Sequence, residues 1–120
     1  TGPYATVVGI FEKQTLEGIP LTVTGTGEQR RDFTHVKDIV SGLVALSKKS
    51  GSGDVYQLGT GKNYSINDLA KMFGGDIIYL DARPGEAWET LADISKTVKA
   101  TGWNPSVSLE NYVKDFMSKM

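Results

Sequence analysis

The sequence predicts an α/β fold in which short strands alternate with helices. Several segments carry apolar residues at the spacing of one helix face, which indicates amphipathic helices. Between them lie short segments rich in Val, Ile, Thr and Tyr, such as 21–24 and 76–80, which indicate strands. With 120 residues, the chain is at most one domain and is long enough to bury a core.

The N-terminal part is predicted to form a helix followed by a strand. Val7, Val8 and Phe11 share one helix face. Gly18 lies where that helix should end, since glycine readily adopts the left-handed conformation that closes a helix. The strand is expected at Leu21–Thr24, where β-branched residues predominate.

A turn and an arginine-containing segment separate this strand from a second helix. Gly25-Thr26-Gly27 predicts the turn. Apolar residues then recur at helical spacing over 36–47. Thr34 is expected to cap this helix, and Asp38 in its first turn would interact favourably with the helix dipole.

The middle of the chain is predicted to contain a strand and a capped helix. Residues 50–53 form a flexible Ser-Gly break, and 54–58 is expected to be a buried strand. Ser65 and Asp68 then form a variant of the capping box, which opens a helix extending to Phe73.

A further strand at 76–80 precedes two short helices. Asp93 is expected to cap the first of them, which ends at Thr101-Gly102 with Trp103 packing back on it. Ser108 caps the second. Its apolar face contains Leu109, Tyr112, Val113 and Phe116.

The composition excludes several classes of protein. Lys and Arg total 13 against 14 for Asp and Glu, so no general field attracts nucleic acid or a membrane surface. The absence of cysteine removes disulfides, thiolate metal sites and a cysteine nucleophile. No signal peptide and no apolar run of about 18 residues is present, and we expect a cytoplasmic protein. Because the chain begins with Thr1, we expect a processed product or an excised fragment.

Two arginine segments form the most informative pattern. Arg30-Arg31 follows a turn, and Arg83 is followed by Pro84-Gly85, which should hold its backbone still. The planar guanidinium group suits phosphate oxygens, so two such arginines converging on one cleft would hold a diphosphate. Asp32 is able to pair with either neighbouring arginine, and Glu86 either accepts a ribose hydroxyl or is exposed. The alternative is that these arginines are solvated surface residues.

Two glycine pairs and the single histidine are more simply explained as structural residues than as phosphate or metal sites. Gly25-x-Gly27 lacks the third glycine of a dinucleotide fingerprint, which favours a plain turn. Gly59-x-Gly61 precedes a capped helix, where free N–H groups suit an anion, although a loop-to-helix junction is the simpler interpretation. His35 has no second histidine or cysteine, which argues against a metal site.

The order of these motifs resembles the C-terminal part of the extended short-chain dehydrogenase/reductases, the NAD-dependent nucleotide-sugar epimerases and dehydratases of the UDP-glucose 4-epimerase type. The resemblance spans nearly the whole chain. It rests on residues 21–38, 55–61, 83–86, 91–96 and 102–105.

The resemblance implies a substrate site for a nucleotide-diphosphate sugar, most simply a UDP-sugar. Arg31 looks like the arginine that grips the diphosphate, and Arg83 looks like its partner from the other side. Glu86 resembles the acidic residue that reaches the ribose. The backbone around Val23 and Thr24 resembles the strand edge that pairs with the base. Thr24 replaces an aromatic residue that is common there.

Phe33 would help to line the pocket for the base.

The resemblance further implies that residues 1–120 are a C-terminal nucleotide-sugar-binding domain that normally packs against an N-terminal Rossmann domain. Residues 54–59 would form the edge strand of that domain's sheet. Without the sheet, Val55 and Tyr56 would face water, so we expect self-association or binding to a separate N-terminal half.

Two parts of the family pattern are missing from this sequence. The glycine-rich NAD loop and the catalytic Tyr-x-x-x-Lys pair lie N-terminal to everything present here. NAD therefore belongs to the parent enzyme and none is expected to bind this chain alone, which we expect to be inactive. Epimerase and dehydratase both stay open, as does a stand-alone, non-catalytic binding or interaction module that retains the fold.

Overall fold

A computed structural model describes residue 4 and residues 6–48, 55–86 and 88–120 of the chain. The helices are α1 (Thr6–Glu17), α2 (Val36–Ser47), α3 (Ile66–Phe73), α4 (Ser95–Thr101) and α5 (Leu109–Ser118). The strands are β1 (Leu21–Thr24), β2 (Arg30–Arg31), β3 (Tyr64–Ser65) and β4 (Ile77–Leu80). This mixture of helices and short strands confirms the predicted α/β class.

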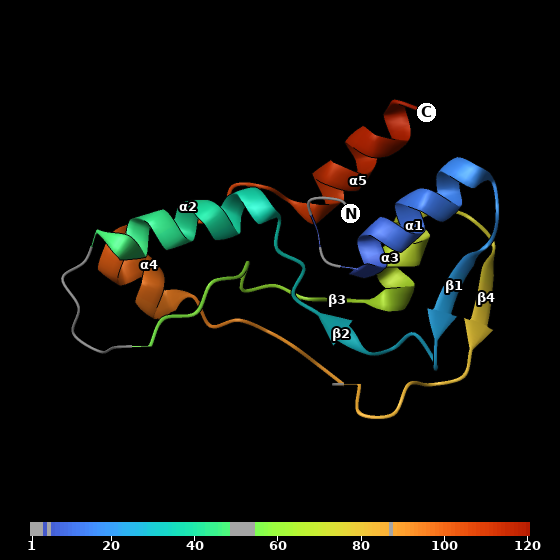
Figure 1. Ribbon diagram of the computed structural model, residues 1–120, viewed down its shortest axis with the longest axis horizontal. Coiled ribbons are helices and arrows are strands. Elements are labelled where there is room, and N and C mark those ends of the chain that lie inside the picture. The colour runs from blue at the N-terminus through green and yellow to red at the C-terminus, as the bar shows by residue number, and fades with distance from the viewer. Residues whose placement is uncertain (1–3, 5, 49–54, 87) are drawn as a thin grey trace.

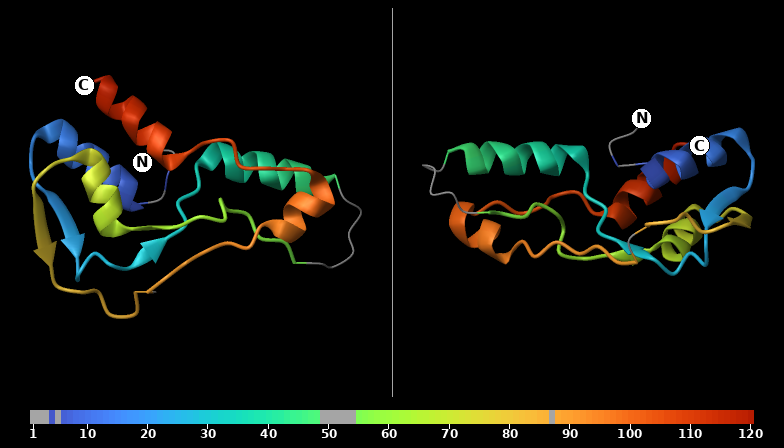
Figure 2. Two further views of the ribbon diagram at one scale, coloured as in Figure 1. Left: turned by 180° about the vertical axis from the view of Figure 1, so that it is seen from behind. Right: turned by 60° about the horizontal axis from the view of Figure 1, so that its bottom comes forward.

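The molecule is elongated and has two lobes. Its radius of gyration is 16.0 Å and its extents are 49 × 35 × 20 Å, whereas a compact domain of this length would have a radius of about 13.6 Å. In Figure 1, α1, α3, α5, β1 and β4 form one lobe, and α2 and α4 form the other. Extended segments connect the two lobes, and the views in Figure 2 show the same division.

The larger lobe is built on a parallel pair of strands. β1 pairs with β4, with Leu21 opposite Ile77 and Thr24 opposite Leu80. A parallel pair requires a crossover connection, and the chain between β1 and β4 includes the whole of α2 and α3. Helices α1, α3 and α5 pack together beside this pair (Figure 1). The fully buried side chains of this lobe include Val8, Phe11, Leu21, Val23, Leu69 and Val113.

A second ladder, which periodicity does not reveal, joins the lobes. β2 pairs antiparallel with β3, with Arg30 opposite Ser65 and Arg31 opposite Tyr64. Arg30 also forms a parallel bridge with Glu89. Each of these strands has only two residues, which is too short for an alternating pattern to identify.

The smaller lobe places α2 against α4 and Trp103. Trp103 is buried, and its Nε1 donates to Ser41 Oγ at 2.9 Å. Trp103 therefore packs on α2 as well as following α4. Gly42 is also buried, and a Cβ at this position would require the Leu58 side chain to shift, so α2 approaches Leu58 closely at this glycine.

Most predicted helix ends are confirmed, but two predicted N-caps, Thr34 for α2 and Asp93 for α4, are wrong. The N-cap of α2 is His35 and not Thr34, because His35 Nδ1 accepts from Lys37 N at 3.0 Å. Ser65 forms the predicted capping box with Asp68, and Ser108 caps α5. At α4 the N-cap is Ile94, and Asp93 Oδ1 accepts from Ser95 N at 3.1 Å.

The strand predicted at 54–58 is not formed among the described residues. Asp54 lies outside them, as does the predicted break at 50–53, and residues 55–58 have no strand partner within the described chain. Val55 is 81% exposed, as expected if this segment lacks a neighbouring sheet. Tyr56 is half-buried, with Lys96 Nζ 4.8 Å from its ring centroid. The assignment of 54–59 to an edge strand stays a prediction.

Candidate functional site

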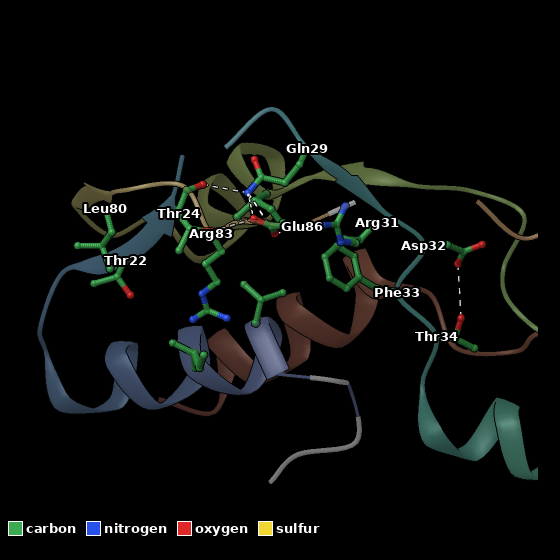
Figure 3. Close-up of a pocket in the computed structure, with 13 residues that line it drawn as sticks. Thr22, Thr24, Gln29, Arg31, Asp32, Phe33, Thr34, Leu80, Arg83 and Glu86 are labelled. Atoms are coloured by element: carbon green, nitrogen blue, oxygen red, sulfur yellow. Dashed lines mark hydrogen bonds and ion pairs between the residues drawn. The ribbon is translucent and has the colours of Figure 1, made fainter. Parts of the chain in front are cut away.

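A pocket of about 350 Å³ opens between β1, α1 and the loop after β4 (Figure 3). It brings together residues that are far apart in the sequence. Of the predicted site residues, Thr24, Arg31, Phe33, Arg83 and Glu86 line it. Val23 does not, because its side chain is buried in the core. The pocket therefore collects two guanidinium groups and a carboxylate beside an exposed strand edge.

The β2–β3 ladder separates the roles of the two adjacent arginines, because successive side chains of a strand point to opposite faces. Arg30 is held by Asn63, donating from Nε to Oδ1 at 2.9 Å and from Nη2 to the backbone O at 3.1 Å. Arg31 instead lines the pocket. The residue pattern left both arginines open and the resemblance pointed to Arg31, which is the one that lines the pocket.

Arg31 and Glu86 form an ion pair across the pocket. Arg31 Nη2 lies 3.1 Å from Glu86 Oε2, and Arg31 Nη1 donates to Arg30 O at 2.7 Å. The Glu86 carboxylate also lies 3.4 Å from Thr24 Oγ1 and 3.5 Å from Gln29 Nε2. Glu86 is therefore not simply an exposed residue.

Gln29 is a site residue that the sequence analysis missed. It lines the pocket, its residue exposure is 5%, and its Nε2 donates to Thr24 O at 2.9 Å. It thus fixes the end of β1 and faces Glu86. Nothing in the local pattern identifies it, because a glutamine after a Gly-x-Gly turn is usually solvated.

Arg83 is the less restrained cation of the site. It lines the pocket, and no described residue forms a hydrogen bond or ion pair with its side chain. In Figure 3 its guanidinium group points from the loop toward α1. The backbone beneath it is turned, since Glu86 N donates to Arg83 O at 3.4 Å and Gly85 has a φ of 78°. The Pro84-Gly85 segment shapes this loop, as predicted.

Asp32 pairs with neither arginine. Its carboxylate accepts hydrogen bonds from the 59–61 loop, namely from Thr60 N at 3.0 Å, Thr60 Oγ1 at 2.6 Å and Gly61 N at 3.0 Å. It also accepts from Ala92 N at 3.2 Å. The free N–H groups at this glycine loop are thus used by an anion of the chain itself. Asp32 is a structural residue that joins three segments.

Neither glycine loop fits the pyrophosphate of NAD. The amides of residues 60 and 61 already bind Asp32. Gly27 packs so tightly against the Asn67 side chain that even a Cβ would clash with it. The described residues therefore form no NAD cradle at either loop.

The single histidine has a structural setting. Besides capping α2, its ring packs edge-on against Tyr4 and Tyr112, with ring centroids 5.2 and 5.7 Å away.

Among the described residues, no group of three or more His, Cys, Asp or Glu side chains is arranged to hold a metal ion. Within the same residues, no helix has the length and apolar character needed to cross a membrane.

A second pocket of about 270 Å³ lies on the other side of Phe33 and contains Lys62, Tyr64 and Glu110. Tyr64 donates to Glu110, and Lys62 Nζ lies 3.3 Å from the same carboxylate. Burial and this hydrogen bond raise the pKa of Tyr64. Burial likewise raises the pKa of Tyr112 to about 12. These environments favour the protonated phenol, which is the opposite of what a catalytic base needs.

The chain matches the family model for GDP-mannose 4,6-dehydratase over residues 6–116. It is 39% identical over 110 residues to UDP-glucuronic acid decarboxylase 1 of Xenopus tropicalis, covering 87% of this chain and 26% of that protein. It is 32% identical over 123 residues to a putative UDP-glucose 4-epimerase of Methanocaldococcus jannaschii, covering 97% of this chain and 39% of the relative.

Solved structures agree with these matches. The UDP-glucuronic acid 4-epimerase of Bacillus cereus, in complex with UDP-glucuronic acid and NAD, superposes with a TM-score of 0.83 at 32% identity. The UDP-glucose 4-epimerase of Thermotoga maritima, with UDP-glucose, gives 0.85 at 30% identity. Each alignment covers 96% of this chain and 40% of the neighbour. The chain therefore belongs to the GDP-mannose 4,6-dehydratase family of extended short-chain dehydrogenase/reductases, and it spans less than half the length of these relatives.

Proposed function

We propose that this chain binds a nucleoside-diphosphate sugar, with a UDP-sugar as the preferred ligand, as the substrate-binding part of an NAD-dependent sugar-modifying enzyme. The observation that carries the proposal is the convergence of Arg31, Arg83 and Glu86 on one pocket. Structural neighbours of this family contain UDP-glucuronic acid or UDP-glucose, which supports the choice of uridine.

The charges of the pocket suit a diphosphate. Arg31 and Arg83 contribute two positive charges and Glu86 one negative charge, while the Asp32 carboxylate is committed to the 59–61 loop. Guanidinium groups bind phosphate oxygens through paired, charged hydrogen bonds. Arg83 has no internal partner among the described residues, so it is available for the first of these bonds.

The free edge of β1 suits the uracil base of the proposed ligand. Leu21 N and Gly25 N donate toward β4, at 2.7 and 2.8 Å. Residues that alternate with them point their backbone groups to the opposite edge, so Thr22 and Thr24 face away from β4. Both of these residues line the pocket.

Two glutamines leave one donor and one acceptor open on this edge. Gln14 Oε1 accepts from Thr22 N at 3.1 Å, and Gln29 Nε2 donates to Thr24 O at 2.9 Å. No described residue forms a hydrogen bond with Thr22 O or Thr24 N, which lie between these two contacts. Uracil offers an N–H donor beside a carbonyl acceptor, which is the complementary pair. Thr22 thus joins Thr24 as a proposed base-binding residue, through backbone atoms.

Hydride chemistry is assigned to another part of the enzyme. NAD, when bound in the parent protein, would supply the hydride acceptor for oxidation of a sugar hydroxyl, and a base would have to take the hydroxyl proton. The present residues would hold the nucleotide end of the substrate and so fix the position of the sugar. The pocket does not distinguish epimerisation from decarboxylation or dehydration, because its residues contact the part of the ligand that these reactions share.

Calorimetric or NMR titration of this chain with UDP-glucose tests the proposal, with NAD as the control ligand. We expect saturable binding of UDP-glucose and no binding of NAD, with NMR shifts concentrated at Thr22, Thr24, Arg31 and Arg83. Binding of neither ligand, or of NAD alone, would contradict the assignment of the pocket to a nucleotide sugar.

We further propose that α2 is the surface on which the rest of the enzyme packs. Val36, Val40, Leu43 and Val44 lie on one side of this helix and are each about half exposed. A contiguous apolar stripe of this kind marks an interface in most soluble proteins. The relatives contain additional chain that this sequence does not match, and we assign that additional chain as the occupant of the stripe.

Sedimentation velocity of the isolated chain tests this surface. Without its covering chain, the stripe should cause concentration-dependent self-association, and a Val40→Lys/Leu43→Lys variant should shift the protein toward monomer. Leu16→Lys is the matched control, because Leu16 is an exposed apolar residue on α1 in the other lobe. A wild-type chain that stays monomeric at high concentration, or a Leu16 variant that dissociates equally well, would exclude α2 as the interface.

A further inference from the structure

We propose that Glu86 makes diphosphate binding conditional on the ribose, so that the pocket selects ligands carrying both a diphosphate and a vicinal diol. This inference rests on the function proposed above and specifies how the same site discriminates among anions. It starts from the ion pair between Arg31 and Glu86, two residues that line the pocket.

The Arg31–Glu86 pair is less exposed than the other ion pairs among the described residues. Its Nη2–Oε2 distance is 3.1 Å, and the side chains are only 20% and 29% exposed. Solvent screens such a pair less than the fully exposed pairs that contribute little to stability. An incoming anion therefore competes with a carboxylate that is already bound in a partly desolvated setting.

Two of the five N–H donors of Arg31 are engaged inside the protein, and one of them faces Glu86. Nη1 donates to Arg30 O at 2.7 Å while Nη2 donates to Glu86 Oε2 at 3.1 Å. A diphosphate that takes Nη2 must displace Glu86 or approach beside its negative charge. Inorganic pyrophosphate does not compensate Glu86 for this displacement, because it has no pair of adjacent hydroxyl groups to donate to the carboxylate.

A nucleoside diphosphate compensates for this displacement. Its ribose carries two adjacent hydroxyl groups, and a carboxylate accepts hydrogen bonds from both. Glu86 stays near the site after leaving Arg31, because Thr24 Oγ1 and Gln29 Nε2 lie 3.4 and 3.5 Å from its oxygens. Gln29 is itself buried and anchored to Thr24 O, so it acts as a positioning residue for Glu86.

The test compares three ligands on the wild-type chain and on Glu86→Gln. The ligands are inorganic pyrophosphate, UDP, and UDP lacking both the 2′- and 3′-hydroxyl groups. Glu86→Gln should bind pyrophosphate about tenfold more tightly, the size of one partly exposed charged hydrogen bond. The same variant should bind UDP more weakly than wild type, and its preference for UDP over the dideoxy analogue should largely disappear.

Two further variants separate this coupling from a general change in charge. Asp81→Asn also removes a negative charge beside the pocket residue Leu80, but Asp81 has no contact with Arg31. It should leave pyrophosphate affinity nearly unchanged. In an Arg31→Ala background, the gain from Glu86→Gln should vanish, since no ion pair remains to be broken.

The outcomes distinguish this inference from the proposed function. If wild type binds neither UDP nor pyrophosphate, the nucleotide-sugar assignment fails and the coupling fails with it. If both ligands bind but Glu86→Gln leaves pyrophosphate affinity unchanged, only the coupling is overturned. It is also overturned if Asp81→Asn has an equal effect, because the gain would then reflect net charge alone.

Discussion

Replacing both Arg31 and Arg83 by alanine is expected to weaken UDP-glucose binding by at least about 100-fold, or roughly 3 kcal/mol. Each side chain is proposed to make a charged hydrogen bond to the diphosphate, and the loss of one such bond costs about 1.5–3 kcal/mol. Single variants should therefore each lose about tenfold or more. Calorimetric titration of the two single variants and the double variant measures these losses directly.

Arg30→Ala is the matched control for this prediction. Arg30 is the neighbour of Arg31 on β2, carries the same charge, and faces Asn63 instead of the pocket. Its removal should change UDP-glucose affinity by less than about threefold, the effect of one distant charge at moderate salt. Equal losses in the Arg30 and Arg31 variants would indicate non-specific charge attraction and would remove the basis for a diphosphate site.

Asp38→Ala is expected to lower the free energy of unfolding by about 3–5 kcal/mol. Asp38 is 1% exposed, and its carboxylate accepts from Ser106 N, Ser106 Oγ and Val107 N, each at 2.9 Å. Removing the acceptor leaves these donors unpaired in a buried setting, at about 1–3 kcal/mol each before relaxation. The contact joins α2 to the segment before α5, so its loss should weaken the attachment of α2 to that segment.

Urea unfolding of Asp38→Ala, Asp38→Asn and Asp115→Ala measures this effect. Asp38→Asn retains one carbonyl acceptor and should be destabilised less than the alanine variant. Asp115 lies on α5 and pairs with Lys119 at the surface, so its variant should stay within about 0.5 kcal/mol of wild type. A small change in Asp38→Ala would show that the three hydrogen bonds contribute little.

The same carboxylate predicts a loss of stability in acid. Burial alone would raise the pKa of Asp38, but the hydrogen bonds from Ser106 and Val107 outweigh it and lower the pKa below its ordinary value of 3.8. The folded state thus holds the proton less tightly than the unfolded state. The contribution of Asp38 is present above that ordinary value and is lost as the pH falls through the lower folded pKa. In Asp38→Asn, the free energy of unfolding should depend less on pH in this range.

Much of the local structure follows from short-range patterns. The caps at Ser65 and Ser108, the helix end at Gly18 and the strand at 21–24 were all predictable, because each depends on residues within one or two turns. The His35 cap shows the limit of this reasoning. A neighbouring threonine is the more usual N-cap residue, and only the backbone path decides that His35 Nδ1 is used instead.

The candidate site depends on longer-range contacts. Sequence pattern and resemblance together suggested Arg31, Arg83 and Glu86 as partners, and the structure brings all three to one pocket. The Arg31–Glu86 ion pair, by contrast, had no local signal, and neither did the participation of Gln29. Hydrogen bonds between residues this far apart depend on how the loops pack, which periodicity does not report.

By itself, the sequence determined the fold class, most helix boundaries and the candidate phosphate-binding arginines, because these depend on local spacing, capping and side-chain chemistry. Only the tertiary structure decided that Arg30 is held by Asn63 at the ladder, and that Asp32 binds the 59–61 loop. It also placed Val23 in the core, with Thr22 and Thr24 at the open edge. The physical reason is that a two-residue ladder and a long-range carboxylate contact fix side-chain direction without leaving a periodic pattern in the chain.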